Sequence, residues 1–286
     1  MSVHTATQHP GSLCYMVRDE IHKTEKPYFV YFPVDEFPGA KQTNVKFDYH
    51  DVGPSDIRGK TEDFKLDECG FEVVEFHSRF KYKDFNEFSK IENDYYKEVS
   101  DFLQDRMGAA FVQIFDCVIR RRNDQFPEKQ FQNSDVQPVR AVHIDSSRER
   151  KMRRCKRALE DAGIRGGGRL QILNVWKPLR GPVRDWPLAV CDYRSCDDSD
   201  LTLVDQVYPN HYDEGTSLYF NSKHQWYFLS DQQPHEAFLM KMMDSDCQAA
   251  DYCAHAAFPW KEAVKVEDMR ESIEVRCVVF IKGDGK

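Results

Sequence analysis

The 286-residue sequence lacks the features that place a chain in a membrane or outside the cell. No apolar run approaches the ~20 residues that cross a bilayer, and the segment before Glu25 contains no apolar core of a signal peptide. The nine cysteines are odd in number and irregularly spaced, and no Cys-x-x-Cys pair occurs. We therefore expect reduced thiols, a cytoplasmic location and no membrane partner.

The sequence also lacks an excess of positive charge, since 40 Lys and Arg residues against 48 Asp and Glu residues give a net charge of −8. This balance argues against general nucleic-acid binding, which requires neutralisation of phosphates. Hydrophobic residues make up 41% and aromatic residues 13%, enough for a substantial core. Because no repeat or linker divides the chain, residues 1–286 are predicted to form a single domain, with an N-terminal extension (1–110) and a core (111–286).

The pattern of apolar residues predicts a long helix followed by many strands. Residues 28–32 are aromatic and β-branched and predict a strand, whereas residues 38–70 are interpreted as loop. Apolar residues recur every three or four positions over residues 84–107, which predicts an amphipathic helix that packs on the core or on a second copy in a homodimer. Further strands are expected at 110–119, 139–144, 169–176, 188–191, 217–220, 225–229, 237–240 and 272–281. Many short strands in one domain favour a sandwich or barrel.

Two His-x-Asp triplets are candidates for metal binding: His143-Ile144-Asp145 and His211-Tyr212-Asp213. On a strand, residues two apart share a face, so either triplet could grip one metal ion, and a third His would complete a facial triad. Roughly one such triplet is expected by chance in ordinary composition. His143 ends an expected strand, whereas His211 follows the turn-forming Tyr208-Pro209-Asn210 and is interpreted as a surface or packing residue.

The C-terminal region contains a candidate carboxylate anchor. Arg270 and Ser272 open the last expected strand, downstream of His255, and share one face. An arginine fork and a hydroxyl could hold the far carboxylate of 2-oxoglutarate while its keto-acid end chelates iron. The alternative is a surface Arg270 and a core His255.

Longer motifs carry a resemblance to a known family. They are NVWKPL at 174–179, GPV at 181–183, DWPLAVCD at 185–192, RS at 194–195, QWYF at 225–228, DSD at 244–246, HAAF at 255–258 and RESIEVR at 270–276. Over residues 110–281 the sequence resembles the fungal hydroxylase/desaturase family of non-haem Fe(II)/2-oxoglutarate-dependent oxygenases. This family includes gibberellin-desaturase-like enzymes, the novofumigatonin endoperoxidase and the cephamycin 7α-hydroxylation protein.

The resemblance implies a mainly β fold with flanking helices around a double-stranded β-helix, the cupin-like jelly roll. It implies that Fe(II) is held by His143, Asp145 and His255, and that 2-oxoglutarate is held by Arg270 with Ser272. Arg276 is expected to share this role or to support it. Low-ranking candidates for the substrate pocket are Trp226, Asn174 and Trp176, each of which could equally be structural.

The implied activity is oxidation of a small specialised-metabolite intermediate by O2, with release of succinate and CO2. Hydroxylation, desaturation, ring closure and endoperoxidation all remain open. The alternatives are a non-oxidative metal-dependent jelly-roll enzyme, which needs no Arg270 anchor, and a non-catalytic binding protein on the same fold. A basic cluster at 148–157 is interpreted as a solvated helix or loop, or as a mobile lid that attracts an anion.

Overall fold

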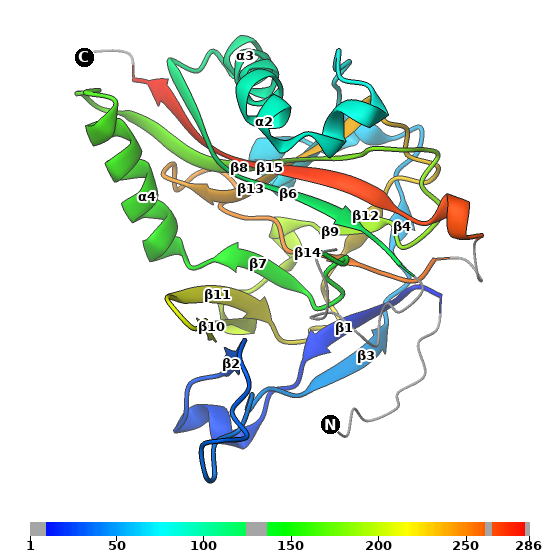
Figure 1. Ribbon diagram of the computed structural model, residues 1–286, viewed down its shortest axis with the longest axis vertical. Coiled ribbons are helices and arrows are strands. Elements are labelled where there is room, and N and C mark those ends of the chain that lie inside the picture. Colours follow the sequence, from blue (N-terminus) through cyan, green and yellow to red (C-terminus); the bar gives the residue numbers. More distant parts are fainter. Residues whose placement is uncertain (1–9, 124–135, 261–264, 284–286) are drawn as a thin grey trace.

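The computed structural model describes residues 10–123, 136–260 and 265–283, which form two large β-sheets with helices packed outside them (Figure 1). The eight-stranded sheet contains, in spatial order, β2 (Tyr28–Val30), β10 (Leu201–Val207), β11 (Tyr212–Leu218), β7 (His143–Ser146), β14 (His255–Ala257), β9 (Leu188–Cys191), β12 (Trp226–Phe228) and β4 (Ser55–Asp56). The five-stranded sheet contains β5 (Phe71–Glu75), β13 (Glu236–Asp244), β8 (Gly168–Pro178), β15 (Glu271–Lys282) and β6 (Phe111–Arg121). A further pair consists of β1 (Ser12–Met16) and β3 (Phe47–Asp51).

Four neighbouring strands from each large sheet form the jelly roll. In one sheet β13, β8, β15 and β6 pair antiparallel, and in the other β7, β14, β9 and β12 do the same. The predicted fold class, a mainly β jelly roll with flanking helices, is confirmed. The N-terminal region adds β2, β4 and β5 to the edges of these sheets, so it shares their hydrogen-bond ladders.

The strand β15 separates two environments. Its odd-numbered residues from Ile273 to Val279 pack in an apolar cluster with Val99 and Leu103 of the long helix. Because side chains alternate along a strand, Ser272, Glu274 and Arg276 leave the opposite face, toward the other sheet. One face of β15 is therefore apolar and covered by helix, and the other lines the interior of the jelly roll with polar groups.

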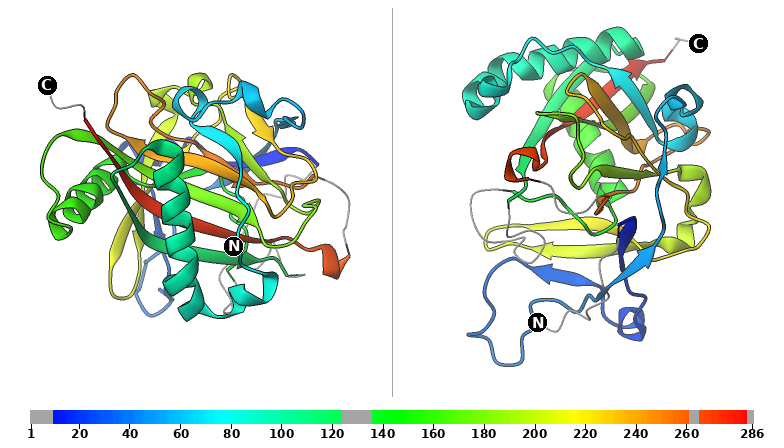
Figure 2. Two further views of the ribbon diagram at one scale, coloured as in Figure 1. Left: turned by 90° about the horizontal axis from the view of Figure 1, so that it is seen from above. Right: turned by 90° about the vertical axis from the view of Figure 1, so that its right-hand side faces the viewer.

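The predicted helix is confirmed from residue 88 to 107, where α2 (Phe88–Lys90), a π turn (Ile91–Tyr95) and α3 (Tyr96–Met107) follow one another. Gly108, with φ of 64°, ends it in the left-handed conformation that glycine favours. Its apolar stripe faces the five-stranded sheet, which α3 crosses in Figure 2. The expected first turn at 84–87 is instead the end of a 3-10 turn (Tyr82–Asn86).

The basic cluster forms an ordered helix, α4 (Arg148–Asp161), at one end of the sheets (Figure 1). Lys151, Cys155 and Ala158 are buried on its inner side. Of the outer basic residues, Arg150 pairs with Asp213, and Arg154 lies over the ring of Phe115. This arrangement favours the solvated-helix interpretation over the mobile lid.

Several elements escaped prediction. The interpretation of 38–70 as loop was wrong in part, because it contains β3, β4 and α1 (Leu66–Cys69). The strands β1, β5, β10 and β14 were also missed, although β14 carries His255. All five residues of β1 are buried, so it shows no alternation of polar and apolar residues, and β4 has only two residues. No helix in the described part of the chain is long and apolar enough to cross a bilayer.

Candidate metal centre

The two predicted histidines and the aspartate meet on neighbouring strands of the eight-stranded sheet. His143 and Asp145 lie two residues apart on β7 and share one face. His255 on β14 pairs directly with His143, and their ring centroids lie 4.3 Å apart. His143 Nε2 is 3.8 Å from Asp145 Oδ1, and one ligand atom from each of the three residues lies within 4.8 Å of the others. Two imidazoles and a carboxylate in this arrangement can hold one divalent metal ion.

Main-chain carbonyl groups orient both histidines. His143 Nδ1 donates to Ala141 O at 2.8 Å, and His255 Nδ1 donates to Cys253 O at 3.1 Å. Because a carbonyl oxygen only accepts, each Nδ1 carries the proton and each Nε2 keeps its lone pair for a metal. Burial and, to a smaller extent, His255 lower the pKa of His143 to about 3, so this ring is neutral near pH 7.

Asp145 is held by two residues of the opposite sheet. Arg276 donates through Nε to Oδ2 at 3.1 Å and through Nη2 to Oδ1 at 3.2 Å. Asn174, the ladder partner of Arg276, donates through Nδ2 to Oδ2 at 2.8 Å. Burial alone would raise the pKa of Asp145, but the charge of Arg276 is the largest opposing influence, and the net shift is downward. These contacts keep the carboxylate ionised and fix its orientation.

Ser272 lies on the same inward face of β15 as Arg276, and Arg270 directly precedes the strand; Arg270 and Ser272 are 3% and 1% exposed. Arg270 Nη1 donates to Trp186 O at 2.6 Å, and its guanidinium carbon lies 5.6 Å from the ring centroid of Trp176. Arg270 Nε and Ser272 Oγ have no hydrogen-bond partner among the described residues. A polar ligand bound here would supply the hydrogen-bond partners that these two buried atoms lack.

The three pocket candidates lie in different surroundings. Asn174 contacts the carboxylate of Asp145, and the buried Trp176 lies under Arg270. Trp226 is buried and donates through Nε1 to Tyr15 OH at 2.6 Å. Trp226 pairs with Cys191, whereas His255 pairs with the preceding residue of β9, so Trp226 and His255 leave their sheet on opposite faces. These contacts favour a packing role for Trp226.

The second triplet lies apart from this centre. His211 stands in the turn before β11, with Nδ1 2.8 Å from Asn210 Oδ1 and its ring stacked on Tyr208. Asp213 pairs with Arg150 of α4. The surface placement matches the interpretation from the sequence.

Comparisons with known proteins identify the family. A family model described as "Oxidoreductase/YMDC permease-like domain" matches residues 13–280. The hydroxylase/desaturase efuI of Hormonema carpetanum is 32% identical over 83% of this chain and 86% of its own length. The Fe(II)/2-oxoglutarate-dependent dioxygenase nvfI of Aspergillus novofumigatus is 31% identical over 88% of this chain and 90% of its own. This chain belongs to the family of fungal Fe(II)/2-oxoglutarate-dependent dioxygenases.

The fold of this dioxygenase agrees with that assignment. A solved structure of the iron and alpha-ketoglutarate-dependent endoperoxidase NvfI superimposes on it with a TM-score of 0.80 at 27% identity, covering 96% of this chain and 98% of that one. The residues in place also fit both cofactors of the family, Fe(II) and 2-oxoglutarate. Two oriented imidazoles and an ionised carboxylate fit Fe(II), and the unpartnered atoms of Arg270 and Ser272 fit a carboxylate.

Glu274 belongs to this site of the dioxygenase and was missed from the sequence. It is buried between Ser272 and Arg276 and accepts from Asn174 Nδ2 at 2.8 Å and from Arg276 Nη2 at 2.9 Å. Asp116 on β6 also pairs with Arg276. The alternation of polar and apolar residues from 270 to 276 is the signal that could have found Glu274.

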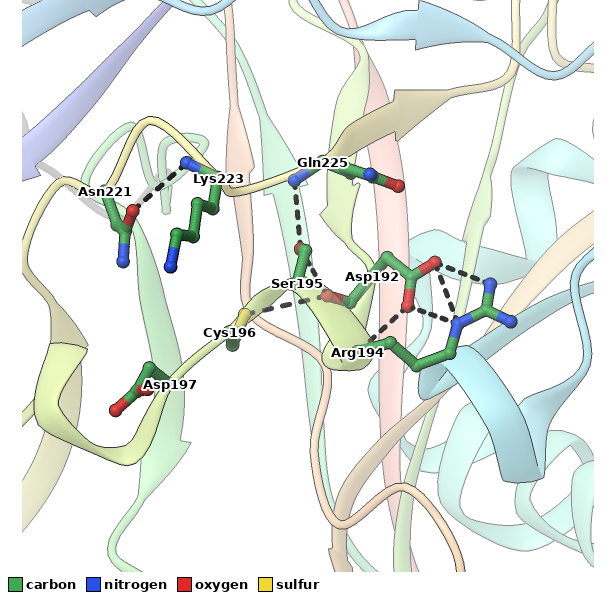
Figure 3. A pocket seen from close by; sticks show the side chains of 8 residues that line it. All are labelled: Asp192, Arg194, Ser195, Cys196, Asp197, Asn221, Lys223 and Gln225. Atoms are coloured by element: carbon green, nitrogen blue, oxygen red, sulfur yellow. Dashed lines mark hydrogen bonds and ion pairs between the residues drawn. The ribbon is translucent and has the colours of Figure 1, made fainter.

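A separate surface hollow of about 420 Å³ lies next to β9 (Figure 3). It is lined by Asp192, Arg194, Ser195, Cys196, Asp197, Asn221, Lys223 and Gln225. Its polar groups partner one another: Arg194 Nη2 donates to Asp192 Oδ2 at 2.7 Å, and Gln225 N donates to Ser195 Oγ at 2.9 Å. No residue of the His-Asp-His group lines this hollow, so it is distinct from the metal centre.

Proposed function

We propose that His143, Asp145 and His255 hold the Fe(II) of this dioxygenase, and that Arg270 and Ser272 bind the far carboxylate of 2-oxoglutarate. The observation that carries this assignment is the pair of buried, unpartnered atoms, Arg270 Nε and Ser272 Oγ, on the same face as the arginine that holds Asp145. When bound, the iron and 2-oxoglutarate supply the oxidising chemistry that consumes O2 and yields succinate and CO2.

In this proposal Arg276 supports Asp145 and does not bind 2-oxoglutarate directly. Its nitrogens already contact Asp145, Glu274 and Asp116, which leaves little donor capacity for a ligand. Arg270, by contrast, has an Nε without a partner among the described residues, and its guanidinium carbon lies 5.6 Å from the ring centroid of Trp176, within the range of a cation–π contact. In this proposal Arg276 therefore positions the metal ligand Asp145, and Arg270 binds the far carboxylate of 2-oxoglutarate.

The proposed substrate is a small specialised-metabolite intermediate. The relatives carry the descriptions hydroxylase/desaturase and endoperoxidase, so hydroxylation, desaturation, ring closure and endoperoxidation all stay within the proposal. Because the same metal ligands serve all these outcomes, the walls of the substrate pocket decide among them. A single domain spanning 1–286, a cytoplasmic location, a homodimer and the absence of nucleic-acid or membrane partners stay predictions.

Anaerobic titration with Fe(II) and 2-oxoglutarate tests the assignment, because a keto acid chelated to Fe(II) produces a visible charge-transfer band. We expect this band in the wild type and in His211→Ala, the matched control from the other His-x-Asp triplet. His143→Ala should lose both the band and turnover. If His143→Ala kept full iron binding and turnover, the metal assignment would be wrong.

A second measurement separates the rival functions. Stoichiometric succinate formation with a screened substrate supports the oxygenase. Turnover without succinate would favour a non-oxidative metal enzyme, and failure to bind Fe(II) under anaerobic conditions would favour a binding protein.

A further inference from the structure

Four arginines lie along the interior face formed by β6 and β15. β6 and β15 lie side by side in the five-stranded sheet (Figure 1). In their antiparallel ladder Ser272 pairs with Arg120, and Arg276 pairs with Asp116. Cross-strand partners share a face, so Arg120 lies on the same interior face as Arg270, Ser272 and Arg276. Arg122, two residues further along, hydrogen-bonds through its main-chain N–H to Arg270 O and belongs to this face too.

Two of these four arginines have carboxylate partners. Arg276 pairs with Asp145, Glu274 and Asp116, and Arg122 Nε lies 2.6 Å from Asp185 Oδ2. Each of these two guanidinium charges is therefore balanced inside the protein.

The other two arginines form no ion pair with any carboxylate in the described ranges. Arg120 Nη1 donates to the main-chain oxygen of Gln137 at 2.9 Å, and Arg270 Nη1 donates to that of Trp186. Asp185 lies near Arg270, but it accepts from the main-chain N–H of Arg270 and not from its guanidinium. Arg120 and Arg270 thus lie on either side of Ser272, and neither guanidinium group has a direct carboxylate partner among the described residues.

This arrangement is unfavourable without an anion. Burial and, next, the charge of Arg120 lower the pKa of Arg270 to about 9. Neighbouring buried guanidinium groups repel each other, so an anion bound between them is stabilising. Neighbouring positions on paired strands are about 5 Å apart, and positions two apart on one strand are about 7 Å apart, so one carboxylate can reach all three residues.

We propose that Arg120 is a further binding residue for the far carboxylate of 2-oxoglutarate. Arg120 binds this carboxylate from β6, while Arg270 and Ser272 bind it from the start of β15. This inference rests on the proposed function of the site. Three donors from two strands make the pocket end selective for a second carboxylate, so Arg120 acts as a specificity residue for the co-substrate. Arg120 does not contact the proposed metal ligands, and Asp145 is oriented by Arg276 and Asn174 instead.

The test compares 2-oxoglutarate with 2-oxopentanoate, a keto acid of the same chain length that lacks the far carboxylate. Anaerobic titration of the Fe(II)-loaded protein gives an affinity for each acid from the charge-transfer band. For Arg120→Gln we expect the affinity for 2-oxoglutarate to fall by about tenfold or more, because a charge-assisted hydrogen bond is lost. The affinity for 2-oxopentanoate should change by less than about threefold, since that acid never makes this contact.

Matched variants make the result specific. Arg121→Gln is the control, because Arg121 leaves the opposite face of β6 and pairs with Glu271. Arg120→Lys keeps the charge and should retain part of the preference for 2-oxoglutarate, which also covers the case in which Arg120→Gln fails to fold. Co(II) binding, followed by its visible spectrum, should be unchanged in all three variants.

The outcomes separate this inference from the proposed function. One outcome is that Arg270→Gln loses affinity for 2-oxoglutarate while both Arg120 variants bind it as tightly as the wild type. Arg120 then has no part in binding the far carboxylate, and the proposed function stands. An equal loss of affinity for both keto acids would also overturn the role of Arg120 in recognising the second carboxylate. A wild-type protein that binds Fe(II) but not 2-oxoglutarate overturns both.

Discussion

Arg276 holds both carboxylate oxygens of Asp145, with Nε 3.1 Å from Oδ2 and Nη2 3.2 Å from Oδ1. The contact joins β15 of one sheet to β7 of the other, the strand that carries His143 and Asp145. Since Glu274 and Asp116 hold the same guanidinium in turn, Asp145 is oriented by a network anchored in the five-stranded sheet.

Replacing Arg276 should therefore weaken metal binding more than co-substrate binding. We expect Arg276→Gln to reduce Co(II) affinity by about tenfold or more, a usual effect of losing a residue that orients a metal ligand. The Co(II) affinity of Arg276→Lys should lie between that of Arg276→Gln and that of the wild type, because an ammonium group cannot form the bidentate contact with Asp145. Titration with 2-oxoglutarate at saturating Fe(II) is the control. A selective loss of 2-oxoglutarate affinity would instead make Arg276 a co-substrate ligand.

Asn174 offers a sharper test of the same network, because its Nδ2 bridges Asp145 Oδ2 and Glu274 Oε1, each at 2.8 Å. Asn174→Asp replaces the donor by a third carboxylate, so repulsion is added to the lost hydrogen bonds. We expect Asn174→Asp to lower thermal stability and Co(II) affinity more than Asn174→Ala does. Equal effects of the two substitutions would argue against a bridging role for the amide.

The sequence was sufficient for the parts of the site that depend on local spacing. His143 and Asp145 are two residues apart, as are Arg270 and Ser272, so strand periodicity alone predicts that each pair shares a face. Joining the two pairs with His255 required the family resemblance, because a single sequence does not tell which distant strands become neighbours.

The residues that were missed depend on pairing between strands. The strand register places Arg120 opposite Ser272. Glu274 reaches the site through its contacts with Asn174 on β8 and with Arg276. No local pattern distinguishes Arg120 from Arg121, although one faces the interior and the other pairs with Glu271. Similarly, the aromatic character of Trp226 does not reveal that its indole faces Tyr15.

Trp226→Phe tests whether that tryptophan packs the core or lines the pocket. The substitution removes the hydrogen bond to Tyr15 OH and leaves unfilled volume, so unfolding free energy should fall by about 1–2 kcal/mol. Affinity for Fe(II) and 2-oxoglutarate, and KM for a screened substrate, should stay within about twofold of the wild type, because Trp226 and His255 face opposite sides of the sheet. A large change in substrate KM with unchanged stability would instead place Trp226 in the pocket.

Lys177 gives a prediction about stability and pH. It is 4% exposed, its Nζ lies 5.7 Å from the ring centroids of both Phe76 and Phe85, and burial lowers its pKa to about 8. The charged form is therefore disfavoured in the folded state, and the contacts with the two rings offset only part of that cost. Lys177→Met should raise the unfolding free energy at pH 7 by roughly 1–3 kcal/mol.

The sign of the pH dependence follows from the lowered pKa. Below about pH 8 Lys177 is charged in both states, so the advantage of Met is complete there. Between pH 8 and the unfolded value of 10.5 the unfolded chain binds more protons, so the wild type gains stability relative to Lys177→Met and the difference shrinks. Chemical denaturation of both proteins at pH 7 and pH 9.5 measures this difference.

Lys241→Met is the matched control, because the buried Lys241 pairs with Asp67 and Asp244, and its loss should destabilise the protein. A Lys177→Met protein less stable than the wild type at pH 7 would mean that the contacts with the two phenyl rings outweigh the cost of burying the charge.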